Sequence, residues 1–305
     1  GPLRRRGVVS EFLELSFAGI ALGSRYALVA LGFVIIFRAT GVINFAHGGL
    51  LLLGTYLTYA LITTGIPFAP AVILAMVGAA LFGAAVERAA LRPLVGRPVY
   101  AAIMVTVGLL FVMEQIASTI WGHNALTLGD PWGLDTVTAG SVVMPVKDLW
   151  TIGLAAAALA AFFVLLRYSR IGVAMRATAA DPEAALAQGI SAGRVTAVSW
   201  AIAAALATVA GVTFAAGPNA LSPGLVGVAL VAFPAMILGG MDSPGGAVVG
   251  GLIIGLVQSL TAGYQEDVLP WAGENVHTVM PFVVMILILL VRPYGLFGTP
   301  EVRRI

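Results

Sequence analysis

Long apolar runs separated by short polar connections make up most of the sequence. About 20 helical residues cross a hydrocarbon core about 30 Å thick, and several runs approach that length. Helices are predicted near residues 14–37, 44–62, 67–86, 99–121, 149–166, 195–216, 225–240, 247–263 and 276–291. A membrane β-barrel would instead show strands of about 10 residues with polar alternation. The pattern therefore predicts an all-α polytopic membrane protein with about eight to nine transmembrane helices.

The composition agrees with this pattern. Hydrophobic residues make up 60% of the chain and charged residues 10%, whereas about 25% of the residues in a soluble domain are charged. No shift in composition, linker or low-complexity tract divides the chain, and the first apolar run is too long for the apolar part of a signal peptide. We therefore expect residues 1–305 to form a single transmembrane domain.

Basic residues gather in alternate connections, and this sets the expected orientation. Lys and Arg accumulate in short cytoplasmic loops. Three regions are therefore predicted to be cytoplasmic: Arg88, Arg92 and Arg97; Arg167, Arg170, Arg176 and Arg194; and Arg292, Arg303 and Arg304 in the tail. The turn at Pro244, Gly245 and Gly246 is expected on the same side.

Acidic residues dominate the remaining long connections, which are predicted to be external. Residues 122–148 hold Asp130, Asp135 and Asp148 against Lys147, and residues 264–275 hold Glu266, Asp267 and Glu274. The alternation fails at the start, because three full crossings before Arg88 would place Arg4, Arg5 and Arg6 outside. Either the amino-terminus breaks the rule or one early segment is incomplete.

The cytoplasmic connection 167–194 contains the clearest local pattern. Asp181 is a preferred N-cap, Glu183 favours the positive end of a helix dipole, and Gly189 suits the left-handed residue after a helix end. These residues predict a helix of about two turns, which is too short to be stable alone and needs a surface to pack on. That surface is either the underside of the membrane domain or a groove on a soluble partner that receives Ala184, Ala185 and Leu186.

Polar side chains within the apolar segments are candidates for a translocation path, because polar groups at membrane depth usually face the bundle interior or a water-filled path. Asn44 and His47 stand three apart and would share one face of a helix. The candidates are Asn44, His47, Glu114, Gln115 and Gln258. For each of them a structural hydrogen bond to a neighbouring helix is the alternative.

Glycines are frequent near the carboxyl-terminal segments. They are Gly239, Gly240, Gly245, Gly246, Gly250, Gly251 and Gly255. Small residues let helices approach closely in a membrane, so tight packing is predicted here, with unwound backbone along a path as the alternative. Residues 217–224 cannot continue a helix and are expected to form an external link.

The sequence offers little for catalysis. It has no HExxH and no paired-aspartate cluster for magnesium, and it has no cysteine. The phosphate-binding loop of ATPases ends in Gly-Lys-Ser/Thr, whereas Lys147, the only lysine, follows Val146. We expect a non-enzymatic chain without a cofactor or metal of its own, so any nucleotide energy must come from another chain.

Several segments recur together in a recognisable order. They are the run from Tyr26 to Tyr56 with its Asn-Phe-Ala-His-Gly signature, Glu87-Arg88 with Arg92-Pro93, Arg167-Tyr168-Ser169-Arg170-Ile171-Gly172, Arg176-Ala177, Gly189-Ile190, and Arg292-Pro293 with Gly295-Leu296-Phe297-Gly298. In these segments the chain resembles the first permease of branched-chain amino-acid ABC importers, the LivH type. The resemblance covers nearly the whole chain.

The resemblance implies the permease of an ATP-driven, binding-protein-dependent importer in the bacterial cytoplasmic membrane, with a cytoplasmic carboxyl-terminus. It implies a second homologous permease, two cytoplasmic ATPases that hold ATP and magnesium, an external solute-binding protein and surrounding lipid, and no nucleic acid. The substrate is expected to cross between the two permeases. Residues 170–190 are similar to the coupling segment of such permeases, which favours ATPase docking. The implied coupling residues are Arg170, Gly172, Arg176, Asp181, Glu183, Ala184, Ala185 and Gly189.

Two positions depart from the family pattern. Asp242 stands in the turn after the seventh segment, and Gln258 stands where an acidic residue is common. The family also serves urea, short amides and aromatic acids, so these remain open beside leucine-like substrates. The alternative from another class is an ion-coupled secondary transporter, which would need coupling sites such as intramembrane acids, of which Glu114 is the clear example.

Overall fold

Each of the predicted apolar segments contains a helix in the computed structural model, which describes residues 7–299 except 134, 218–219, 269–272 and 274. These helices are α1 (Val8–Thr40), α2 (His47–Thr63), α3 (Phe68–Val86), α4 (Val99–Trp121), α5 (Val146–Tyr168), α8 (Ala192–Ala215), α9 (Gly227–Gly239), α10 (Pro244–Val268) and α11 (Val276–Val291). In the described part of the chain, six helices are long and apolar enough to cross a membrane, and the apolar helices Pro223–Gly239 and Val276–Val291 are shorter. The polytopic helical fold is confirmed.

Several smaller elements lie between these helices. They are η1 (Glu87–Leu91), a π-helical turn; η2 (Arg92–Leu94) and η3 (Pro223–Val226), both 3-10 turns; the strands β1 (Thr136–Ala139) and β2 (Val142–Pro145); and the helices α6 (Arg170–Ala180) and α7 (Pro182–Ala187). The strands pair antiparallel, with Thr136 opposite Pro145. A short hairpin thus accompanies the helices, with β-branched residues on both sides of Gly140, whose φ is 65°.

The centre of the bundle is α1, which packs against α10 along one side and against α5, α8 and α9 on others. Close contact with α10 depends on glycines, because a Cβ at Gly23 would lie 2.7 Å from Cα of Leu252 and one at Gly251 would lie 2.6 Å from Cα of Ala27. The middle of α1 is buried, with Leu28, Leu31 and Val34 fully inside. The predicted role of the glycines in tight packing is confirmed for this pair of helices.

A methyl group added at Gly255 is expected to destabilise the bundle, because it would overlap the backbone N and Cα of Gly23 on α1. Overpacking that only a backbone shift can relieve costs about 1–3 kcal/mol. Gly255→Ala should therefore lower the thermal unfolding midpoint of the purified protein. The matched control is Gly108→Ala on α4, where nothing lies within 4 Å of the added Cβ. Equal midpoints for the two variants would contradict a tight α1–α10 interface.

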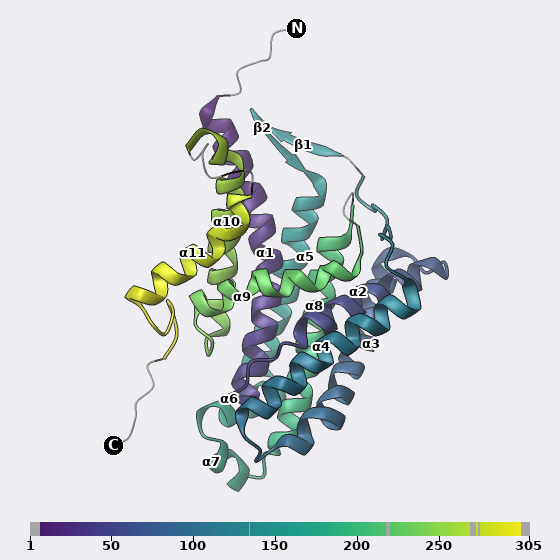
Figure 1. The fold of residues 1–305 in the computed structure, drawn as a ribbon, viewed down its shortest axis with the longest axis vertical. Helices are drawn as coiled ribbons and strands as arrows, with labels where there is room; N and C mark the ends of the chain where they lie inside the picture. Colours follow the sequence, from purple (N-terminus) through teal and green to yellow (C-terminus); the bar gives the residue numbers. More distant parts are fainter. Residues whose placement is uncertain (1–6, 134, 218–219, 269–272, 274, 300–305) are drawn as a thin grey trace.

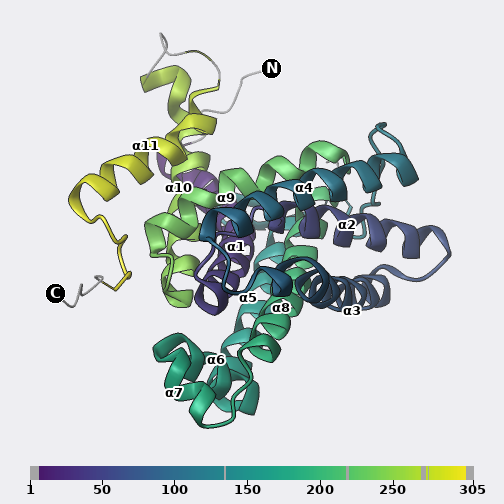
Figure 2. The same cartoon turned by 60° about the horizontal axis from the view of Figure 1, so that its bottom comes forward.

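The connections predicted to be cytoplasmic converge at one end of the bundle. Arg92 Nη2 donates a hydrogen bond to the carbonyl of Gly193 at 2.6 Å, which joins the 87–97 connection to the start of α8. The helices α6 and α7 lie at this end, opposite the β1–β2 hairpin (Figure 1). In Figure 2 they stand apart from the main body of helices. The alternation of basic residues thus predicts which connections meet in space.

The connections predicted to be external meet at the hairpin end. Leu126 and Leu221 form a backbone bridge between residues 122–148 and 217–224. The amide of Val143 in β2 donates a hydrogen bond to Glu14 Oε1 near the start of α1 at 2.9 Å. The start of α1 therefore lies at this end, and α1, α2 and α3 precede Arg88. Of these three, α2 is not among the six helices of the described chain that are long and apolar enough to cross a membrane, so both alternatives for the amino-terminus stay open. Arg4, Arg5, Arg6, Glu274, Arg303 and Arg304 lie outside the described residues.

Candidate functional site

The coupling segment begins with a tight turn between α5 and α6. Ser169 caps α6, because its Oγ accepts a hydrogen bond from the amide of Gly172 at 2.9 Å. Gly172 is buried, and a Cβ there would lie 2.5 Å from the carbonyl oxygen of Leu165. Arg176 donates a hydrogen bond back to the carbonyl of Leu166 at the end of α5. The turn therefore joins α6 firmly to a helix of the bundle. Arg170, at the first position of α6, is exposed.

The short helix predicted after Asp181 is confirmed as α7. The Asp181 carboxylate accepts hydrogen bonds from the amides of Glu183 at 3.0 Å and Ala184 at 2.9 Å. Gly189 follows the helix with a φ of 81°, the left-handed conformation that favours glycine. Sequence reasoning missed α6, although Ser169 as an N-cap was a signal that could have found it.

Each face of α7 has a different environment. Ala185 is 5% exposed and packs inward, whereas Leu186 is 64% exposed. Glu183 and Ala184 are also exposed. The grouping of Ala184, Ala185 and Leu186 as one outward surface is therefore wrong for Ala185, because a two-turn helix needs one apolar contact with its own domain to be stable. The outward face still presents a large apolar side chain beside a carboxylate.

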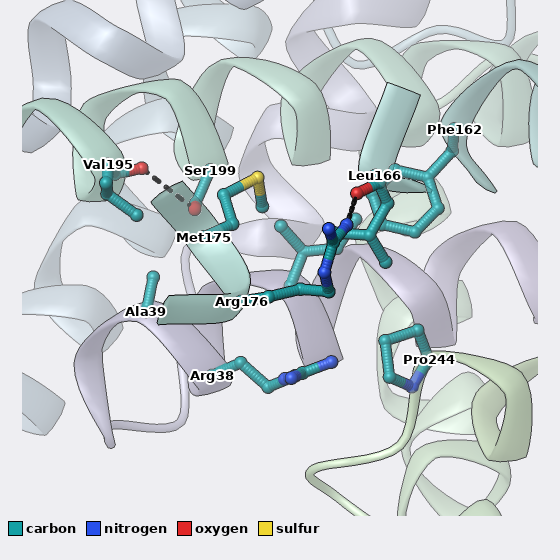
Figure 3. Close-up of a pocket in the computed structure, with 10 residues that line it drawn as sticks. Arg38, Ala39, Phe162, Leu166, Met175, Arg176, Val195, Ser199 and Pro244 are labelled. Atoms are coloured by element: carbon teal, nitrogen blue, oxygen red, sulfur yellow. Dashed lines mark hydrogen bonds between the residues drawn. The ribbon is translucent and has the colours of Figure 1, made fainter. Parts of the chain in front are cut away.

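Below the end of α1 lies a small hollow of about 20 Å³ that connects the coupling segment to the bundle. Figure 3 shows Arg38 of α1 extending toward Pro244 of α10, with Arg176 of α6 turned toward the carbonyl of Leu166. Met175 of α6 and Val195 of α8 also line this hollow. A displacement of α6 would therefore reach α1 and α8 directly, and Pro244 of α10 borders the same hollow.

A larger cavity, here called the inner cavity, lies near the same end of the bundle and has a volume of about 330 Å³. It is bounded by the end of α1, the loop before α2, η1 and η2, the start of α4 and the start of α8. Its polar and charged lining residues are Thr40, Asn44, Glu87, Arg92, Arg97, Thr106, Thr196 and Trp200. The Arg92 Nη2 atom lies 3.1 Å from Glu87 Oε2, and Glu87 is 2% exposed.

Asn44 lies in the loop before α2 and not on that helix, which begins at His47. Its Oδ1 accepts a hydrogen bond from the amide of Ala46 at 3.0 Å, and its side-chain nitrogen is buried without a hydrogen-bond partner. The expectation that Asn44 and His47 share one helix face is therefore corrected. An Asn that bonds the backbone two residues on favours a turn over a helix.

His47 is fully buried at the start of α2, against α1. Its ring lies 4.6 Å from that of Phe33, measured between centroids, and a Cβ at Gly32 would overlap it. The backbone carbonyl of Val29 is the polar group beside the ring, and neither ring nitrogen forms a hydrogen bond of normal geometry. Gly32 thus provides the space for an imidazole between two helices.

A second cavity, here called the outer cavity, lies toward the hairpin end and has a volume of about 310 Å³. Arg25 of α1 forms an ion pair there with Asp148 of α5, with 3.3 Å between Nη2 and Oδ1. The Tyr26 hydroxyl donates a hydrogen bond to Gln258 Oε1 at 2.8 Å. Both Arg25 and Gln258 line the cavity. The uncharged amide of Gln258 is therefore paired with an uncharged hydroxyl group, that of Tyr26.

The five predicted path residues lie in different places. Asn44 lines the inner cavity and Gln258 the outer one, while His47 is enclosed between α1 and α2. Glu114 is half-buried on α4, and Gln115 is exposed and donates a hydrogen bond to Thr119 Oγ1 at 3.3 Å. Neither of these two lines the inner or the outer cavity. Their part in transport stays a prediction.

Two residues that line the cavities were not identified from the sequence. Arg25 lies within the first predicted segment, and an arginine at membrane depth is by itself a signal of function or of a buried partner. Trp200 lines the inner cavity, and a tryptophan within an apolar run carries no such signal.

Asp242, which departs from the family pattern, has a hydrogen-bond partner in the structure. Its carboxylate accepts hydrogen bonds from the amide and hydroxyl of Thr299. Among the described residues, no group of three His, Cys, Asp or Glu side chains could hold a metal ion.

The chain is similar to permeases over almost its whole length. Its residues 15–289 match the family described as "Branched-chain amino acid transport system / permease component". It is 33% identical to the high-affinity branched-chain amino acid transport system permease protein LivH of Escherichia coli K12, over 96% of this chain and 98% of that one. It is 30% identical to the permease protein BraD of Pseudomonas aeruginosa, over 97% and 99% of the two chains.

A solved structure supports the fold alone. PsaBC from Streptococcus pneumoniae in complex with Fab matches with a TM-score of 0.51 and 15% identity, over 93% of this chain and 92% of that one. The family itself is assigned by the match over residues 15–289 and by the two sequence identities given above. The chain belongs to the family of permease components of the branched-chain amino acid transport system.

Proposed function

We propose that the chain is the transmembrane permease subunit of an ATP-driven, binding-protein-dependent importer of branched-chain amino acids or a related small solute. The observation that carries this proposal is the chain-long similarity to permeases with that printed role. The outward face of α7, with Glu183 and Leu186 exposed, is consistent with it, because this face is free of contacts with the rest of the chain and so is accessible to a soluble partner.

The energy for transport would come from partner chains. The sequence contains no Gly-Lys-Ser/Thr phosphate-binding loop, so ATP and magnesium would be held by two cytoplasmic ATPases. Closure of the ATPase pair on ATP would move α6 and α7, and the contacts of Arg176 and Met175 around the hollow would carry this displacement to α1, α8 and α10. Such a displacement biases the bundle between outward-open and inward-open states.

The remaining partners follow from the same proposal. The end that carries α6, α7 and the 87–97 connection would face the cytoplasm together with the carboxyl-terminus, and the hairpin end would face an external solute-binding protein. An apolar face of α4 includes Tyr100, Met104 and Phe111, which are exposed. That face would contact lipid or a second homologous permease, and solute would cross between the two permeases.

Reconstitution in vesicles tests this function. Vesicles that contain the chain with its ATPases and second permease should take up labelled leucine only under two conditions. ATP must be inside the vesicle, where the ATPases face it, and a binding protein must be outside. ATPase activity should rise when the loaded binding protein is added. Uphill uptake by this chain alone on an ion gradient would contradict the proposal and favour a secondary transporter.

A further inference from the structure

The connection between α3 and α4 changes its helical winding twice. The chain is α-helical to Val86, π-helical in η1 (Glu87–Leu91) and a 3-10 turn in η2 (Arg92–Leu94). The amide of Arg92 donates its hydrogen bond to the carbonyl of Glu87, whereas an α-helix would use the carbonyl of Arg88. Short π-helical turns within α-helices are frequent at functional sites. This turn is therefore a candidate for a part that moves.

One nitrogen of Arg92 holds the π-helical turn to α8. Nη2 lies 3.1 Å from Glu87 Oε2 and donates a hydrogen bond to the carbonyl of Gly193 at 2.6 Å. Each terminal nitrogen of a guanidinium carries two N–H donors, so these two acceptors use both. Glu87 is 2% exposed, and a buried carboxylate is costly to leave without its cation. These three residues, here called the Arg92 bridge, hold the turn close to the start of α8.

The space between Gly193 and the guanidinium is narrow. A Cβ at Gly193 would lie 3.3 Å from Cζ of Arg92 and 3.4 Å from its Nη2. A larger side chain at this position would push the guanidinium away from the carbonyl that it binds. The absence of a side chain at Gly193 therefore allows the bridge to form.

Gly193 follows the coupling segment through hydrogen-bonded backbone. The amide of Ile190 donates a hydrogen bond to the carbonyl of Ala185 in α7 at 3.0 Å. Ser191 then caps α8, because its Oγ accepts a hydrogen bond from the amide of Arg194 at 3.4 Å. Little of the chain between α7 and α8 is thus free to absorb a displacement. A movement of α7 would therefore reach Gly193.

The Arg92 bridge also forms part of the wall of the inner cavity. Glu87, Arg92 and Gly193 all line this cavity, together with Leu94 and Val99 on the way into α4. The connection between α3 and α4 lies at the same end of the bundle as α7 (Figure 1). Because η1 and η2 bound the cavity on one side and α8 bounds it on another, the bridge sets the separation of these two walls.

We propose that Arg92 is a positioning residue for transport, which transmits the movement of α7 through Gly193 to the π-helical turn and so to α3 and α4. The proposal rests on the proposed function, because an ATPase is the partner that would move α7. When the start of α8 moves, the guanidinium follows the Gly193 carbonyl and carries the buried Glu87 with it. The walls of the inner cavity then move with the coupling segment, which links the access state of the bundle to the ATPases.

The test measures leucine uptake and ATP hydrolysis by the reconstituted complex with its ATPases, second permease and binding protein. The number of leucines imported per ATP does not depend on the amount of folded complex, so a merely structural defect leaves this ratio unchanged. Glu87→Gln combined with Arg92→Met removes the bridge without leaving a buried charge. It should lower the ratio about tenfold, because the hydrogen bonds lost involve charged groups. The control Arg88→Met, exposed on the same turn, should keep the wild-type ratio.

A second variant breaks the bridge from the other side. Gly193→Val places a branched side chain against the guanidinium of Arg92 and leaves both charges in the chain. It should lower the ratio about threefold or more. The matched control is Gly245→Val in the first turn of α10, where nothing lies within 4 Å of the added Cβ. This control should keep the wild-type ratio.

Other outcomes overturn the proposal. A wild-type ratio in both bridge variants, whether or not uptake and hydrolysis fall together, would make the Arg92 bridge a structural contact alone. An equal fall in Arg88→Met would assign the effect to the positive charge of the turn. Should the double variant fail to assemble, the ratio of the Gly193→Val complex decides. A wild-type complex that hydrolyses ATP without importing leucine would instead refute the proposed function, and the role of Arg92 with it.

Discussion

Glu183→Lys in α7 is expected to lower ATP-driven uptake about 30-fold or more while the protein still inserts into the membrane. Glu183 is exposed in the first turn of α7, where a negative charge stabilises the positive end of the helix. Reversal of this charge weakens the helix and changes the surface that the ATPase would contact. Loss of a contact worth about 2 kcal/mol lowers the population of the docked complex about 30-fold. Uptake by vesicles and co-purification of the ATPase measure the effect.

The control is Glu266→Lys, the same substitution at an exposed position near the carboxyl-terminal end of α10. It should leave co-purification of the ATPase at the wild-type level, because α10 ends far from α6 and α7 in Figure 1. If both variants retain the ATPase equally, α7 is not the docking helix. A loss of membrane insertion in Glu183→Lys alone would assign the residue to folding.

Gly189→Trp should produce the same loss of uptake for a different reason. Nothing lies within 4 Å of a Cβ at Gly189, so bulk alone is tolerated by this chain. The φ of 81° strains any L-residue by about 1 kcal/mol and disturbs the turn after α7. The indole would also cover the surface beside Leu186. Gly189→Ala carries the strain without the bulk, so a difference between the two variants isolates the docking contact.

The helices of the bundle could be predicted from hydropathy because the bilayer requires long apolar segments with internally bonded backbones. The ends of those helices were harder to predict from the sequence. The loop that holds Asn44 lies inside the predicted segment 44–62, because its apolar neighbours hide a turn that only the side-chain hydrogen bond to Ala46 reveals. The hairpin at residues 136–145 was missed for the opposite reason, since four-residue strands are too short to stand out from a polar connection.

The candidate site was predictable where local chemistry determines structure. The cap at Asp181 and the turn at Gly189 specify α7 through backbone geometry alone. The cavities depend on contacts across long sequence separations, such as Arg92 with Gly193 and Tyr26 with Gln258. No local pattern determines which residues meet in this way, so hydropathy could propose Asn44 and Gln258 as polar positions but could not assign them to different cavities.

Removal of one member of the Arg25–Asp148 ion pair is expected to destabilise the bundle more than any other single change in the described residues of the outer cavity. Each side chain is 12% exposed, and Arg25 Nη2 also lies 3.4 Å from Thr151 Oγ1. Asp148→Ala would leave a guanidinium with little water and no counter-charge. Such a change costs about 3–5 kcal/mol when one partner of a buried pair is removed. The thermal unfolding midpoint of the purified protein measures it, with the exposed Asp267→Ala as the matched control.

The double variant Arg25→Met with Asp148→Leu separates a structural role from a transport role. Replacement of both charges by apolar side chains removes the unpaired charge, so stability should return most of the way to that of the wild-type protein. Uptake should return with it if the pair only holds α1 against α5. If stability recovers while uptake stays lost, the charges themselves act on the solute in the outer cavity. A single Asp148→Ala variant as stable as Asp267→Ala would mean that water, and not the partner side chain, compensates Arg25.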